Sequence, residues 1–79
     1  MPTILRIDAF RFFFFSNEGF EPPHIHVESG DGYAKYWLKP VILANFSGYS
    51  STELNKIRKL TVDKEDLFLL KWNEYFNKK

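Results

Sequence analysis

The stretch that decides the fold is HIHVESGDGYAKYWL, residues 24–38. Polar and apolar side chains alternate on both sides of residues 30–31, a pattern typical of two strands joined by a tight turn. With these two residues as the loop, the strands pair outward until His24 lies opposite Trp37. A shift by one position would place Lys35 among apolar side chains, so we predict this register.

The predicted register gives the hairpin two faces of different character, because neighbouring side chains of a strand point to opposite sides. The apolar face carries Ile25, Val27, Ala34, Tyr36 and Leu38. The other face, called the His face below, carries His24, His26, Glu28, Tyr33, Lys35 and Trp37. We expect the rest of the chain to cover the apolar face.

Three further strands are expected, at residues 4–7, 11–16 and 41–46. The second of these contains four consecutive phenylalanines, residues 12–15. A strand that is apolar on both faces is typically central, or has one face covered by a partner. Residues 17–23 have the composition of a loop, and long loops on a rigid scaffold often carry function.

The chain after Gly48 has helical patterns. Ser50 and Glu53 match a capping box, and apolar residues then follow at helical spacing. Asp63 is predicted to be the N-cap of a second helix that runs to about Phe76. The sequence therefore predicts an α+β fold: an antiparallel β-meander of four to five strands followed by two C-terminal helices packed on the sheet.

Length and composition point to one domain, residues 1–79, without cysteine and with no cofactor expected. The net charge of +1 gives no electrostatic case for nucleic acid. We find no signal peptide or membrane-span pattern and expect a cytoplasmic protein. Aromatic residues make up 19% of the chain. So much aromatic surface favours a homodimer or a partner protein.

The His face is the candidate site. His24 and His26 have the side chain best suited to acid–base catalysis near neutral pH, and Lys35 suits a phosphate or oxyanion. These three are the candidate catalytic residues, for RNA cleavage without a metal. A metal bound by both histidines and Glu28 is the weakest alternative. The structural alternative is that His24 stacks on Trp37 and that Glu28 pairs with Lys35.

We favour the structural alternative, and then a binding surface ahead of catalysis or a metal site. The stiff Pro22-Pro23 segment leads into the first strand of the hairpin. The predicted binding residues are Pro22, Pro23, His24, His26, Glu28, Tyr33, Lys35 and Trp37.

Several motifs resemble those of one known family. They are MPTI at residues 1–4, EPPHIHV at 21–27, AKYWL at 34–38, GYS at 48–50 and WNEYF at 72–76. In this order they resemble the small bacterial family called domain of unknown function 4160, over nearly the whole chain. PPHIHV is the most specific part of the resemblance.

The resemblance implies a stand-alone cytosolic protein whose gene often lies beside another small gene. Such pairs are sometimes described as toxin–antitoxin or regulatory modules, so a small protein encoded by the neighbouring gene is the implied partner. The resemblance does not assign a catalytic role to any residue. The leading hypothesis is a protein-interaction module that binds through the His face. The alternatives are a small ribonuclease-type toxin and a non-catalytic nucleic-acid-binding regulator. The near-neutral charge argues against the regulator, which is weakly supported.

Overall fold

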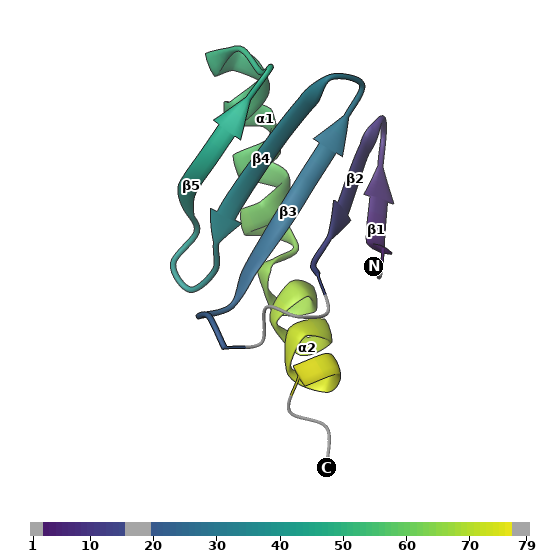
Figure 1. Cartoon of the computed structure of the whole chain (residues 1–79), viewed down its shortest axis with the longest axis vertical. Coiled ribbons are helices and arrows are strands. Elements are labelled where there is room, and N and C mark those ends of the chain that lie inside the picture. Colours follow the sequence, from purple (N-terminus) through teal and green to yellow (C-terminus); the bar gives the residue numbers. More distant parts are fainter. Residues whose placement is uncertain (1–2, 16–19, 77–79) are drawn as a thin grey trace.

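The computed structural model describes residues 3–15 and 20–76 and has the expected α+β arrangement (Figure 1). Five strands form one antiparallel sheet in sequence order, and two helices follow. The elements are β1 (Thr3–Ile7), β2 (Phe10–Phe13), β3 (His24–Ser29), β4 (Gly32–Trp37), β5 (Ile42–Ser47), α1 (Ser51–Asp63) and α2 (Glu65–Phe76). The predicted loop at residues 17–23 is described only from Phe20 onward, because residues 16–19 lie outside the described part.

The β3–β4 hairpin has the register predicted from the sequence. Its pairs run from His24 opposite Trp37 to Ser29 opposite Gly32. Gly30 at the tip has a φ of 51°, a left-handed conformation that suits glycine. The turn and the alternation thus select the same pairing, which fixes the membership of the apolar face and of the His face.

Strand β2 is shorter than the predicted strand at residues 11–16 and begins one residue earlier. After Phe13 the chain leaves the sheet, and the next two rings pack in different places. Phe14 packs against Trp72 of α2, with ring centroids 5.5 Å apart, whereas Phe15 packs against His26 at 4.7 Å. The phenylalanine run therefore supplies both sides of the sheet, and its last two residues do so from outside the strand.

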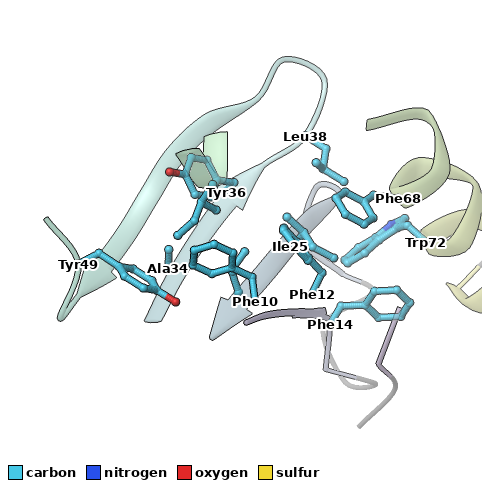
Figure 2. Packing of buried hydrophobic residues seen from close by; sticks show 12 residues of the cluster. Phe10, Phe12, Phe14, Ile25, Ala34, Tyr36, Leu38, Tyr49, Phe68 and Trp72 are labelled. Carbon is cyan, nitrogen blue, oxygen red and sulfur yellow. The ribbon is translucent and has the colours of Figure 1, made fainter. Parts of the chain in front are cut away.

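The hydrophobic core lies between the apolar face and the two helices (Figure 2). Phe12 of β2 is fully buried and stacks on Phe68 of α2, with ring centroids 5.2 Å apart. In Figure 2 the core side chains form a continuous row from Tyr49 to Trp72. The buried cluster consists of Phe10, Phe12, Phe14, Ile25, Val27, Ala34, Tyr36, Leu38, Tyr49, Ile57, Phe68 and Trp72.

The start of α1 is as predicted, but the start of α2 is not. The Ser50 side chain accepts a hydrogen bond from the backbone N–H of Glu53, whose carboxylate accepts one from the backbone N–H of Ser50. Asp63 was predicted as an N-cap and is instead the last residue of α1. The Lys64 carbonyl accepts the first hydrogen bond of α2, from the N–H of Phe68 at 2.9 Å. Helix α1 extends this far because its buried face continues to Thr61.

Helix α2 lies beyond the lower ends of β2 and β3, so the molecule is elongated (Figure 1). Its principal extents are 40 × 22 × 21 Å. This position brings Trp72 to the end of the sheet, where β3 begins. Neither helix within residues 3–15 and 20–76 is long and apolar enough to cross a membrane.

Tyr36 makes the stability of the fold sensitive to alkaline pH. Burial raises the pKa of Tyr36 above its ordinary value of 10.0, an effect that Arg58 partly opposes. As the pH rises above about 10, the unfolded chain loses this proton before the folded chain does. The contribution of Tyr36 to the free energy of unfolding is therefore constant below about pH 10 and falls above it.

We expect the Tyr36→Phe variant to lose less stability than the native chain between about pH 9 and pH 11, because it has no phenol to titrate. Urea unfolding at several pH values measures the difference. At neutral pH the variant should be about 1 kcal/mol less stable. The cause is the loss of the hydrogen bond that the Tyr36 hydroxyl donates to the Leu54 carbonyl at 2.9 Å. An identical alkaline decline in both proteins would contradict the assignment.

Candidate functional site

The strand register brings the residues of the His face together from β2, β3 and β4. His26 pairs with Lys35 on one side and with Phe13 on the other. Side chains of directly opposed residues lie on the same face of a sheet. Phe13 therefore joins the His face, while its neighbour Phe12 points into the core.

His26 lies in the middle of a stack of aromatic rings and is 2% exposed. Its ring is nearly parallel to those of Phe13 and Tyr33, with centroids 5.4 Å and 5.8 Å away. The Phe15 ring meets it edge-on at 4.7 Å. Nδ1 of His26 is hydrogen-bonded to the Tyr33 hydroxyl at 2.8 Å. The imidazole is thus packed as a core ring would be.

His24 is also buried, at 0% exposure, where the sheet meets α2. Its ring contacts Trp37 with a centroid distance of 5.6 Å, but edge-on, with 85° between the ring planes, and not stacked as predicted. It also contacts Trp72, with a centroid distance of 4.9 Å. Nδ1 lies 3.0 Å from the Pro22 carbonyl oxygen. Because a carbonyl only accepts hydrogen bonds, Nδ1 carries the hydrogen in this contact. The proline segment therefore orients the imidazole of His24.

The charged residues of the His face do not pair as predicted. Lys35 Nζ bonds to Glu21 Oε1 at 3.0 Å, and the Arg11 guanidinium bonds to Glu28 Oε2 at 2.7 Å. The prediction that Glu28 pairs with Lys35 was wrong. Arg11 lies directly opposite Glu28 across the β2–β3 ladder, so its guanidinium forms the ion pair with Glu28 in place of Lys35. The Lys35 ammonium also lies 4.5 Å from the centroid of the Trp37 ring, a cation–π contact.

Several members of the site were not identified from the sequence: Phe13, Phe15, Glu21, Arg11 and Trp72. The alternation of residues 12–15 was a usable signal for the first two, since every second ring of a strand shares a face. The alternation alone does not tell which of the two faces each ring joins, because the long connection between β2 and β3 sets no register. Nothing in the sequence pattern places Trp72 beside His24.

The His face has no enclosed space for a small ligand. No cavity or cleft is present within the described part of the chain. Every buried side-chain nitrogen or oxygen of the described residues has a hydrogen-bond partner. Within residues 3–15 and 20–76, no three side chains of the metal-binding types come together, and Glu28 is engaged by Arg11.

At one end of the His face, half-buried residues lie next to an exposed segment, and the two together are called the Trp37 patch. Phe20 is 83% exposed, the most exposed large apolar side chain of the described residues. The segment that carries it runs beside the end of β4, where the Leu38 N–H donates to the Pro23 carbonyl at 3.0 Å. The patch consists of Phe20, Glu21, Pro22, Lys35 and Trp37.

Comparison with known proteins identifies a family. The family model described as Domain of unknown function (DUF4160) matches residues 9–73. No curated protein and no solved structure matches the chain. The match covers the strands β2 to β5, the helix α1 and most of α2. It therefore contains the whole His face, and we conclude that this chain belongs to the DUF4160 family.

Proposed function

We propose that this protein is a protein-interaction module that binds a small protein encoded by a neighbouring gene. The two would form a toxin–antitoxin-like or regulatory pair, and the Trp37 patch would be the contact surface. The observation that carries the proposal is the 83% exposure of Phe20, which precedes Glu21, the ion-pair partner of Lys35. The two imidazoles of the His face are buried.

The composition of the Trp37 patch supports binding of a protein. Aromatic residues are enriched among the side chains that dominate binding energy. The Lys35–Glu21 ion pair places charges of both signs next to Phe20 and Trp37. Such a surface matches an apolar partner surface rimmed by polar groups, rather than a polyanion. A net charge of +1 also supports a protein partner over nucleic acid.

Burial of the histidines favours binding over catalysis. A general base must come within hydrogen-bonding distance of the proton that it removes. His24 and His26 are 0% and 2% exposed, and aromatic rings surround both. Lys35 is held by Glu21, which reduces its value as a phosphate contact. The ribonuclease-type alternative would require the face to open.

The test is affinity for the product of the neighbouring gene, measured by titration calorimetry with purified proteins. We expect Phe20→Ser to weaken binding at least about tenfold, since an aromatic anchor is worth about 1.4 kcal/mol or more. Leu70→Ser is the matched control, because Leu70 is an apolar residue 53% exposed on α2, outside the patch. Unchanged affinity of the Phe20 variant, or no complex with the native chain, would overturn the proposal.

A further inference from the structure

Strand β5 is an edge strand that lacks the charges and proline that usually protect an edge. The backbone N–H of Phe46 donates a hydrogen bond to Asn45 Oδ1 at 2.9 Å, and a pairing strand would have to replace this bond. It is the last strand of the sheet, and all six of its residues are exposed. Exposed edge strands commonly carry charges or proline that prevent another strand from adding to them. Residues 40–52, which include β5, contain no Lys, Arg, Asp or Glu and form the longest uncharged run of the chain. The opposite edge, β1, carries the exposed charge of Arg6.

A bulge in β5 sets which of its side chains share a face. Asn45 pairs with Lys35 and Leu43 pairs with Tyr36, so Ala44 has no partner of its own on β4. Leu43 therefore lies on the helix side of the sheet, as does Phe46, which pairs with Ala34. Both apolar side chains are exposed there.

The same edge can pair with itself only in the antiparallel sense, about a two-fold axis. If the axis passes between Ala44 and Asn45, Leu43 lies opposite Phe46 of the second copy, on the helix side of both sheets. A shift by one residue in either direction places Leu43 opposite Asn45 or Ser47, which lie on the His face. Larger shifts shorten the pairing. Only one register therefore keeps both faces consistent along the whole strand.

We propose that two copies of this chain pair along β5 in this register and form one continuous sheet. The absence of charge is the argument for a second copy. A two-fold interface places each residue of the strand opposite a near neighbour on the same strand of the second copy, so a strand without charges brings no unpaired charge into the interface. Leu43 and Phe46 of both copies would then form one apolar cluster between the two α1 helices. This inference does not depend on the proposed function.

The test is the mass in solution, measured by sedimentation equilibrium over a range of concentrations. We expect the native chain to have twice the monomer mass of 9.4 kDa. Phe46→Lys should raise the dimer dissociation constant at least about tenfold, because two ammonium groups would enter the apolar cluster. Leu70→Lys is the matched control, since Leu70 of α2 is 53% exposed and Phe46 is 47% exposed. The control should remain dimeric.

A charge pair tests the register itself. Leu43→Lys and Phe46→Glu should each weaken the dimer, and their combination should restore it, because the register places the new ammonium opposite the new carboxylate. Circular dichroism confirms that each variant is folded. A native monomer at every concentration, or assembly that grows beyond the dimer, would overturn the proposal, as would a double variant no tighter than the single ones. Phe20→Ser should leave the mass unchanged, which separates this test from that of the proposed function.

Discussion

Replacing His26 with alanine should lower the free energy of unfolding by about 3 to 5 kcal/mol, the range found for large buried aromatic rings. The ring is 2% exposed and packs against Phe13, Phe15 and Tyr33. Truncation leaves a cavity among these rings and removes the hydrogen bond between the imidazole and the Tyr33 hydroxyl. In a chain of 79 residues, a loss of this size is a large part of the total stability.

His26→Phe is the matched variant, because it keeps an aromatic ring in the stack, larger by one ring atom, and removes both ring nitrogens. We expect it to cost about 1 to 2 kcal/mol, the price of the lost hydrogen bond with Tyr33. Urea unfolding of the native chain and both variants gives the comparison. Equal losses for alanine and phenylalanine would show that the nitrogens, and not the ring, are what the fold requires.

The phenylalanine variant also separates a structural imidazole from a catalytic one. If the chain is a ribonuclease-type toxin, induced expression should arrest bacterial growth, and a folded His26→Phe variant should not. If His26 is structural, the native chain and the variant should have the same effect on growth. The alanine variant cannot make this distinction, since its loss of stability alone would abolish an activity.

Gly48→Ala should lower the free energy of unfolding by at least about 3 kcal/mol. Gly48 has a φ of 78°, which costs a residue with a side chain about 1 to 2 kcal/mol. A Cβ at this position would also lie 2.6 Å from the Asp31 carbonyl oxygen and 3.1 Å from the Gly32 Cα. Both are backbone atoms, so they cannot move aside as a flexible side chain would. The link from β5 to α1 would have to shift away from the hairpin turn.

Gly30→Ala separates the cost of the left-handed backbone from the cost of the close contacts that an added Cβ makes. Gly30 has a φ of 51°, but an added Cβ would meet nothing within 4 Å. The free energy of unfolding of this variant should therefore fall only by the cost of the left-handed backbone, about 1 to 2 kcal/mol. Urea denaturation of both variants measures the difference. If they lost the same stability, close packing of Gly48 against the hairpin turn would not contribute to the fold.

Local sequence patterns were sufficient to predict the strands and helices and the register of the central hairpin. The alternation around residues 30–31 determined both the turn and the pairing of His24 with Trp37, because a one-residue slip reverses every side chain. The Ser50–Glu53 capping box lies within one turn, so it was also readable. The motifs around PPHIHV were sufficient to identify the family, whose model matches residues 9–73.

The sequence by itself therefore determined the α+β meander, the family and the six hairpin residues of the His face. Only the tertiary structure decided that His24 and His26 are buried. Their covering rings come from Phe13, Phe15 and Trp72, residues brought near by the β2–β3 register and by the position of α2. It also decided that Glu28 pairs with Arg11. Contacts between residues far apart in the chain depend on how the strands and helices pack, and a local sequence pattern does not predict that packing.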